Sequence, residues 1–276
     1  EALPYIRDFE GKTVVIKYGG AAMIDPGLRN STAEDIVLMK YVGMNPVVVH
    51  GGGPAINQML RRLGIESKFS PEGLRITDAD TIAVVEMVLA GSVNKDIVRL
   101  LNQSGGDAVG VSGKDGNLLY ATKIETESGT DIGHVGKITG VHSKVLEVLC
   151  QSGLIPIVAP IATDGSGGTW NINADTAAGE IAAALHAEKL VFLTDIPGLL
   201  RDLNDPTSLI HQLKADDIKE LKRAGVIAGG MIPKIEACLK ALDYGVRKTH
   251  IIDGRVPHSL LLEIFTNKGL GTLVSL

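Results

Sequence analysis

The sequence predicts an α/β protein built on a mainly parallel β-sheet, and two observations carry this prediction. Short runs rich in Val and Ile recur along the 276 residues, and each is followed by glycines and then by a segment with helical spacing of its apolar residues. This alternation is typical of βαβ units with strands covered on both faces. The composition agrees: 45% of the residues are apolar and only 4% aromatic, so aliphatic side chains must form the core.

The strands are placed at the apolar runs and the helices at the amphipathic segments between them. Pro54 suits a first helical position, because the N–H that it lacks would have had no helical partner. The predicted strands span residues 13–17, 46–50, 108–112, 155–160, 190–194 and 248–252. The predicted helices span residues 34–41, 54–63, 78–104, 143–152, 175–186, 214–224, 233–244 and 258–265.

Two glycine-punctuated stretches, 66–77 and 116–141, break this rhythm and favour β-hairpins. The first follows the helix that opens at Pro54, so we expect it to form a lid. The turn at 163–169 is the most linker-like segment. We therefore expect a domain boundary near residue 180, which gives the parts 1–10, 11–179 and 180–276.

Charge and composition exclude several classes of protein. A net charge of -5 argues against binding along a nucleic-acid backbone. No run reaches the roughly 18 apolar residues of a membrane span, and the first residues do not resemble a secretory signal. Two cysteines far apart in the sequence support neither a disulfide scaffold nor a zinc cluster. We expect a cytoplasmic protein, or a plastid protein if a transit peptide has been removed.

Three glycine-rich turns, at 19–20, 51–53 and 229–230, are the first candidates for a ligand site. In an open parallel sheet, ligands collect at the carboxyl ends of strands, where glycines let a phosphate approach the backbone and helix N-termini offer free N–H groups. The alternative is that such turns only relieve backbone strain. Neither a P-loop nor a dinucleotide fingerprint is present.

Two lysines and one carboxylate lie beside these turns. Lys17 ends the first strand, and Lys234 lies in the first turn of a helix, where a positive charge favours a bound anion nearby. Asp175 follows two asparagines in one short turn. It can cap the helix that it opens, or it can orient both lysines while Asn171 binds a substrate carboxylate. Either lysine alone can equally be a solvated surface residue.

Weaker signals come from the turn at 195–200 and from Arg75. The turn follows a strand and suits the edge of a nucleotide, although its Asp-x-Pro-Gly pattern is also that of an ordinary turn. Arg75 lies on the expected lid, where its planar fork suits a carboxylate. The histidines show no metal-ligand spacing, so we predict no metal site.

Five motifs in order give the chain a resemblance to a known family. They are Lys17-Tyr18-Gly19-Gly20, His50-Gly51-Gly52-Gly53-Pro54, Gly73-Leu74-Arg75-Ile76-Thr77, Asn171-Ile172-Asn173-Ala174-Asp175 and Gly230-Met231-Ile232-Pro233-Lys234. On these motifs the chain resembles, over essentially its whole length, the N-acetylglutamate kinases of the amino acid kinase family. The resemblance implies an open three-layer αβα sandwich. Part 11–179 would bind N-acetyl-L-glutamate and form dimers, and part 180–276 would bind ATP with Mg²⁺ as co-substrate, without a protein-ligated metal.

The resemblance also implies the reaction, in which the γ-carboxylate of N-acetyl-L-glutamate is phosphorylated in a step of arginine biosynthesis. Lys17 and Lys234 match transition-state lysines, and Asp175 matches the carboxylate that organises them. The other matches are Gly20 and Gly53 for the phosphoryl group, Gly52, Gly53, Arg75 and Asn171 for the substrate, and Asp195, Ile196, Pro197, Gly198, Leu199, Leu200, Val226, Ile227 and Ala228 for the nucleotide.

Two further segments resemble the arginine-inhibited branch of these kinases. Residues 1–10 are similar to the end of an N-terminal helix that links dimers into a homohexamer, a trimer of dimers. The implied L-arginine pocket contains Tyr5, Lys189, His250, Glu263, Gly269 and Gly271. A complex with the PII signalling protein is left open. Two alternative functions also remain, a kinase for another acidic amino acid and an effector-sensing protein with little turnover.

Overall fold

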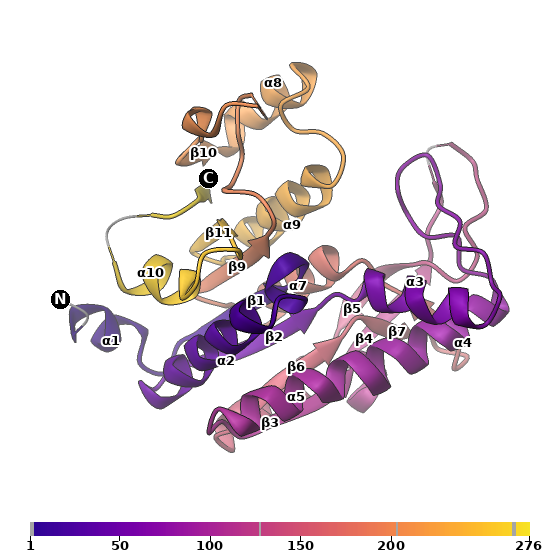
Figure 1. The fold of residues 1–276 in the computed structure, drawn as a ribbon, viewed down its shortest axis with the longest axis horizontal. Coiled ribbons are helices and arrows are strands. Elements are labelled where there is room, and N and C mark those ends of the chain that lie inside the picture. The colour runs from indigo at the N-terminus through magenta and orange to yellow at the C-terminus, as the bar shows by residue number, and fades with distance from the viewer. Residues whose placement is uncertain (1–2, 127, 203, 267–268) are drawn as a thin grey trace.

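An eight-stranded sheet forms the centre of the computed structural model, which describes residues 3–126, 128–202, 204–266 and 269–276 (Figure 1). The strand order is β10-β12-β11-β9-β1-β2-β6-β3, and neighbours run parallel except β11 and β12. The strands are β1 Thr13–Tyr18, β2 Asn45–His50, β3 Ala108–Ser112, β6 Ile155–Ala159, β9 Lys189–Thr194, β10 Gln212–Lys214, β11 Lys248–Asp253 and β12 Thr272–Ser275. All six predicted strands are therefore confirmed.

Helices cover both faces of this sheet, because its strands are apolar on both sides. In β1, Val14 and Ile16 pack on the face of α2, α5 and α10, whereas Val15 packs on the face of α7 and α9. In Figure 1, α2 and α5 lie along the front of the sheet. The helices are α1 Leu3–Phe9, α2 Pro26–Tyr41, α3 Gly53–Arg62, α4 Ala79–Glu86, α5 Asn94–Gln103, α6 Lys144–Gln151, α7 Ala174–Ala184, α8 Ile218–Arg223, α9 Met231–Asp243 and α10 Ser259–Phe265.

Several boundaries differ from the predictions for identifiable reasons. Helix α2 begins at Pro26, because Asp25 caps it by accepting a hydrogen bond from the N–H of Leu28 at 2.9 Å. The helix predicted at 78–104 is interrupted by a π-helical segment, Met87–Val93, that joins α4 to α5. The helix predicted at 214–224 is wrong at its start, since residues 212–214 form β10.

A second sheet of four strands, in the order β5-β4-β7-β8, contains the hairpin predicted within 116–141. Its strands are β4 Leu119–Lys123, β5 Gly136–Val141, β7 Ile161–Thr163 and β8 Thr169–Asn171. The linker prediction at 163–169 is wrong. That segment is a tight turn between β7 and β8, in which Asp164 accepts hydrogen bonds from the N–H groups of Ser166 and Gly168.

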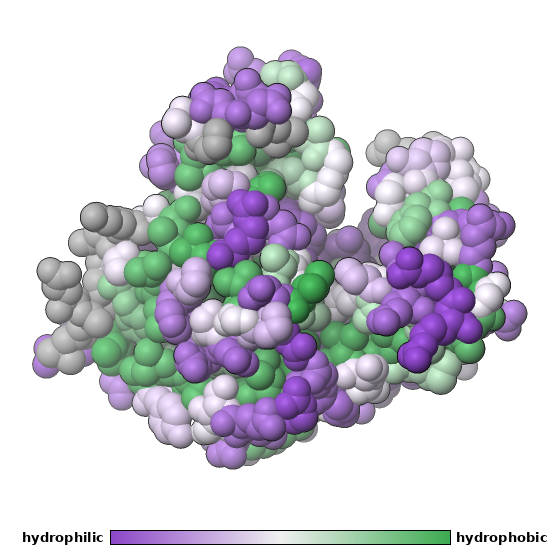
Figure 2. Space-filling view, viewed as in Figure 1, coloured by the Kyte–Doolittle hydropathy of each residue, from purple (hydrophilic) through white to green (hydrophobic). Residues whose placement is uncertain are grey.

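The predicted lid at 66–77 contains a short hairpin, in which Phe69 and Arg75 form an antiparallel bridge. The N–H groups of Ser70 and Ile76 donate to the carbonyls of Leu74 and Lys68 at 2.8 and 2.9 Å, so the hairpin prediction there is confirmed. The lid lies beside the loop between β4 and β5, and the N–H of Ser128 donates to Glu72 Oε1 at 3.0 Å. Both loops project on the right of Figure 1, and Figure 2 shows a hollow between them and the part of the molecule that carries α8.

The predicted boundary near residue 180 lies within α7, and the three-part division stays a prediction. No helix in the described ranges has both the length and the apolar character that a membrane crossing needs.

Candidate active site

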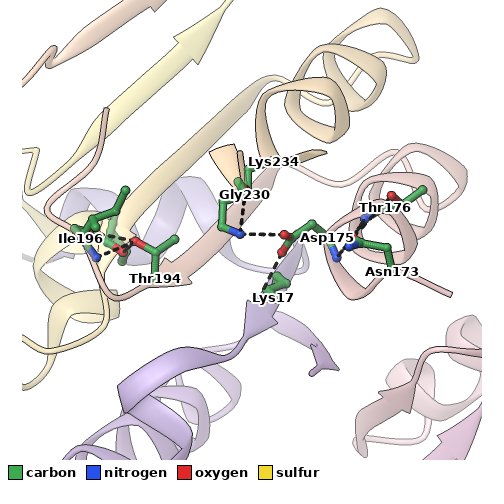
Figure 3. A network of polar contacts seen from close by, with 9 residues as sticks. Lys17, Asn173, Asp175, Thr176, Thr194, Ile196, Gly230 and Lys234 are labelled. Carbon is green, nitrogen blue, oxygen red and sulfur yellow. Dashed lines mark hydrogen bonds and ion pairs between the residues drawn. The ribbon is translucent and has the colours of Figure 1, made fainter. Parts of the chain in front are cut away.

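Lys17, Asp175 and Lys234 meet at the carboxyl edge of the large sheet, although they come from three elements (Figure 3). Lys17 follows Val15 by two positions in β1, so it points to the face covered by α7 and α9. Asp175 lies in the first turn of α7, and Lys234 in the first turn of α9. Asp175 Oδ1 is 3.1 Å from Lys17 Nζ, and Asp175 Oδ2 is 2.7 Å from Lys234 Nζ.

The cap of α7 is Asn173, not Asp175. Asn173 Oδ1 accepts hydrogen bonds from the N–H groups of Asp175 and Thr176, at 2.9 and 3.1 Å. The alternative that Asp175 only caps the helix is therefore wrong, and its carboxylate binds the two ammonium groups instead. The second asparagine of the motif supplies the cap that makes this possible.

The three side chains form a charged cluster that is largely hidden from water. The side chain of Asp175 is 7% exposed, and those of Lys17 and Lys234 are 13% and 17% exposed. Burial by itself would raise the pKa of Asp175, but the two lysine charges outweigh it and hold that pKa below its usual range. One carboxylate between two ammonium groups leaves a formal charge of about +1, which suits an anionic ligand.

The glycine turns at 19–20 and 51–53 line a cavity of about 820 Å³ together with Lys17. Gly20 has a φ of +67°, and a Cβ there would lie 2.3 Å from Asp195 Oδ1. At Gly52 a Cβ would lie 2.5 Å from Leu89 Cδ2. The backbone conformation at Gly20 therefore favours glycine, and a side chain at Gly52 would require Leu89 to move.

The predicted nucleotide residues surround a second cavity, of about 320 Å³. Those that line it are Asp195, Ile196, Gly198, Leu199, Leu200, Val226 and Ala228, together with Lys234. Pro197 and Ile227 do not line it, and Ile227 is 2% exposed within the core. Asp195 lines both cavities and accepts a hydrogen bond from the N–H of Ala21 at 2.5 Å, so the two cavities meet beside the Gly20 turn.

Arg75 is held in place by two polar side chains. Its Nη2 donates to Asn57 Oδ1 at 2.7 Å, its Nη1 donates to Ser67 Oγ at 3.0 Å, and its guanidinium lies 4.7 Å above the ring of Phe69. The residue is 9% exposed, and this burial lowers its pKa. Since Asn57 belongs to α3, which begins at Gly53, Arg75 is fixed to the same helix as the glycine turn.

Asn171, at the end of β8, is held by backbone contacts with residues 134 and 135. Its N–H donates to the carbonyl of His134 at 2.9 Å, and Val135 bridges to it. Gly133, in the same segment, bridges to Thr77 on the lid. Neither Asn171 nor Arg75 lines the two cavities described above, so the structure places this predicted pair on the lid side of the glycine turn.

A third cavity, of about 760 Å³, lies at the amino ends of β9 and β11. Five of the residues predicted for an effector pocket line it: Lys189, His250, Glu263, Gly269 and Gly271. The side chain of Tyr5 lies outside what the structure describes. The sequence alone did not indicate the further lining residues Asp8, Phe9, Arg247 and Lys248, because charged or terminal positions carry no signal of a pocket.

A buried pair, His250 and Glu263, forms the wall of this third cavity. His250 Nδ1 is 2.6 Å from Glu263 Oε1, and Glu263 Oε2 accepts a hydrogen bond from the N–H of Leu270 at 2.9 Å. Burial lowers the pKa of His250, so the imidazole is neutral at pH 7 and donates from Nδ1. Burial would raise the pKa of Glu263, but the hydrogen bond with His250 keeps it below its usual range. The pair therefore carries one negative charge.

The described residues contain no group of three or more His, Cys, Asp or Glu side chains placed to hold a metal ion. They do add one polar pair that sequence reasoning missed, Arg29 and Asp96, which form an ion pair in the lining of the first cavity. No local motif marks these two residues, because they are 67 residues apart in the sequence and meet only through the packing of α2 against α5.

The sequence model described as "Amino acid kinase family" matches residues 12–253. Among relatives, the acetylglutamate kinase of Thermoanaerobacter pseudethanolicus is 58% identical over 274 residues, which cover 99% of this chain and 91% of the relative. The acetylglutamate kinase of Heliobacterium modesticaldum is 57% identical, with 99% and 95% covered. That of Synechocystis is 54% identical, with 99% and 91% covered.

Solved structures confirm the predicted fold class. A Neisseria gonorrhoeae N-acetylglutamate synthase complexed with coenzyme A and N-acetyl-glutamate superposes with a TM-score of 0.87 at 30% identity. It covers all of this chain, which spans only 62% of the synthase. Carbamate kinase from Giardia lamblia bound to AMP-PNP gives a TM-score of 0.70 at 18% identity, covering 96% and 98% of the two chains, and shows likeness of fold alone.

Proposed function

The chain belongs to the amino acid kinase family, and we propose that it transfers the γ-phosphate of ATP to the γ-carboxylate of N-acetyl-L-glutamate. The product is N-acetyl-L-glutamyl 5-phosphate, in a step of arginine biosynthesis. The observation that carries the proposal is the Lys17–Asp175–Lys234 cluster between the glycine-lined cavity and the second cavity. The names of relatives at 54% to 58% identity supply the substrate.

The geometry suits phosphoryl transfer to a carboxylate. Such a nucleophile is already ionised at neutral pH, so the site needs no general base, and catalysis depends on alignment and charge stabilisation. Lys17 and Lys234 would offset the negative charge that spreads over the phosphoryl group in flight. Asp175 would keep both ammonium groups at fixed positions, because each of its oxygens binds one of them.

The remaining predicted residues have consistent places in this scheme. The N–H groups of Gly20 and Gly53 would bind the phosphoryl oxygens, and Gly52, Arg75 and Asn171 would bind the acceptor. The cavity beside Asp195 would take the nucleotide. Mg²⁺ would arrive with ATP as part of the co-substrate, held chiefly by phosphate oxygens and water, as is usual for this ion.

ADP release with different acceptors tests the proposal. We expect release with N-acetyl-L-glutamate, and none above background with L-glutamate, L-aspartate or UMP. Release only with L-glutamate or UMP would overturn the substrate assignment. If no acceptor supports ADP release while L-arginine still shifts the melting temperature, the low-turnover effector-sensing alternative is favoured.

The third cavity supports a second proposal, that L-arginine binds there and inhibits the enzyme. The carboxylate of Glu263 suits a guanidinium, and Lys189, Arg247 and Lys248 supply positive charge for an α-carboxylate. Burial lowers the pKa of Lys189, whose Nζ lies 5.0 Å above the ring of Phe9 from α1. The homohexamer, binding of the PII protein and the cytoplasmic location remain predictions.

Glu263→Gln is expected to raise the arginine concentration that gives half-inhibition by about tenfold or more, because a hydrogen-bonded charge contributes about 1.5–3 kcal/mol. Inhibition curves at fixed N-acetyl-L-glutamate measure the shift. Glu220→Gln, at an exposed position of α8, is the matched control. Equal shifts in both variants, or none in Glu263→Gln, would remove Glu263 from the arginine site.

A further inference from the structure

His50, the last residue of β2, is fully buried and titratable, and the mechanism above gives it no role. It directly precedes the Gly51–Gly53 turn. Its Nδ1 lies 2.8 Å from the carbonyl oxygen of Gly51, and its Nε2 lies 3.2 Å from Asn94 Nδ2. Both ring nitrogens therefore have partners within the protein, one on the turn itself and one on α5.

These partners define the tautomer of the ring. A carbonyl oxygen only accepts hydrogen bonds, so Nδ1 must carry the proton, and Nε2 must then accept from the Asn94 amide. The other contacts of Asn94 fix its amide in the required orientation: Nδ2 also donates to the carbonyl of Ile157 at 2.9 Å, and Oδ1 accepts from Lys95 Nζ at 3.2 Å. Burial lowers the pKa of His50 to about 4, which keeps the ring neutral at working pH.

The π-helical segment Met87–Val93 explains why Asn94 reaches this place. Extra residues in one turn shift the helical register, and π-helical turns frequently occur at functional sites. Asn94 follows the segment directly and is 0% exposed. Leu89, within the segment, lies so close to Gly52 that a Cβ on Gly52 would be 2.5 Å from its Cδ2. The segment thus contacts the glycine turn and also places the partner of His50.

The hydrogen bond to Gly51 sets the direction of the next N–H group. In a trans peptide the C=O and N–H bonds point in opposite directions, and the described residues contain no cis peptide. His50 lies on the α2 and α5 face of the sheet, since it follows Val48 by two positions. The Gly52 N–H therefore points toward the opposite face, which is the face of Lys17. No protein acceptor pairs with this N–H in the described ranges.

We propose that His50 is a positioning residue, which holds the Gly51–Gly52 peptide so that the Gly52 N–H donates to the acceptor or to the transferring phosphoryl group. Asn94 maintains the tautomer that this hydrogen bond requires. The proposal rests on the proposed function, because it assigns the N–H to that reaction. It adds two residues, neither of which touches substrate, to those on which turnover depends.

Two variants of His50 separate positioning from simple packing. In His50→Asn the amide nitrogen replaces Nδ1 and can still donate to the Gly51 carbonyl, whereas in His50→Gln the amide lies one bond further out, near the place of Nε2. We expect both to lower the melting temperature, since both leave space in the core. We expect kcat to remain within about threefold of wild type in His50→Asn and to fall about tenfold to a hundredfold in His50→Gln, because small misalignments cost that much.

Asn94→Asp tests the same idea without a change in volume. Its carboxylate can only accept from Nε2, so a neutral ring carries its proton there and leaves the Gly51 carbonyl without its donor. The measurement is made at about pH 9, because a carboxylate beside the ring raises the histidine pKa and an imidazolium would donate from both nitrogens. We expect kcat to fall about tenfold or more while the KM for ATP changes little. This variant decides the matter if neither His50 variant shows a cooperative melting transition.

Equal kcat values for His50→Asn and His50→Gln, or wild-type kcat in a folded Asn94→Asp, would overturn the positioning role. A wild-type protein without ADP release on N-acetyl-L-glutamate would instead overturn the proposed function, so the two failures are distinguishable.

Discussion

We expect Lys234→Ala and Lys17→Ala each to lower kcat by about 10²- to 10³-fold, because each removes a preorganised positive charge beside the phosphoryl group that is transferred. Turnover at saturating ATP and N-acetyl-L-glutamate measures the loss. Lys240→Ala is the matched control on the same helix. Lys240 Nζ lies 2.6 Å from Glu180 Oε1 and is not part of the Lys17–Asp175–Lys234 cluster. Near-normal turnover in either cluster variant would remove the charge-stabilisation mechanism.

The double variant of Lys17 and Lys234 sharpens this result. Both lysines bind the same carboxylate, and Asp175 loses half of its compensation when either one is removed. Residues that act as one unit are not additive, so the double variant should lose less than the product of the two single losses. Melting temperatures, read in parallel, establish that the variants are folded.

Arg75→Lys is expected to lower kcat/KM for N-acetyl-L-glutamate by about 10- to 100-fold, mainly through KM, because a lysine cannot reproduce a planar, two-point contact with a carboxylate. Lysine also cannot keep both contacts with Asn57 and Ser67. Steady-state kinetics with the acceptor varied measure the change. Arg62→Lys, at an exposed position of α3, is the control.

The outcome that would contradict this assignment is a change in the KM for ATP alone. A larger kcat effect than KM effect would place Arg75 in the transition state instead of in ground-state binding.

Much of the fold followed from local patterns. Strands β2, β6 and β9 contain continuous buried apolar runs, and the parallel direction of the predicted strands puts their carboxyl ends at one edge of the sheet. Lys17 could be placed at a strand end and Lys234 at a helix start from sequence alone. Their contact through Asp175 is a tertiary fact, which the sequence left open as one of two alternatives for Asp175 and which the resemblance favoured.

The misses have physical causes. Strands β10 and β12 span only 212–214 and 272–275, so alternation has too few residues to show. The composition of the turn at 163–169 is that of a linker, but Asp164 orders it by accepting hydrogen bonds from Ser166, Gly168 and Trp170. The π-helical segment at 87–93 keeps the apolar spacing of a helix, and its only sequence signal is the Gly91-Ser92 pair, a type of pair often found at helix kinks. Ile227 is predicted to contact the nucleotide together with its two neighbours in the sequence, but its side chain is buried in the core beside the second cavity.

One strand pair joins two of the sites. β9 and β1 are paired from Lys189 with Val14 to Phe192 with Lys17. Lys189 lies in the third cavity at one edge of the sheet, and Lys17 lies at the other, roughly 10 Å further along at about 3.3 Å per residue. An effector that changed the twist of this strand pair at one end would therefore rotate Lys17 at the other end. Because such coupling is reciprocal, saturating N-acetyl-L-glutamate must weaken the binding of any inhibitor that acts through it.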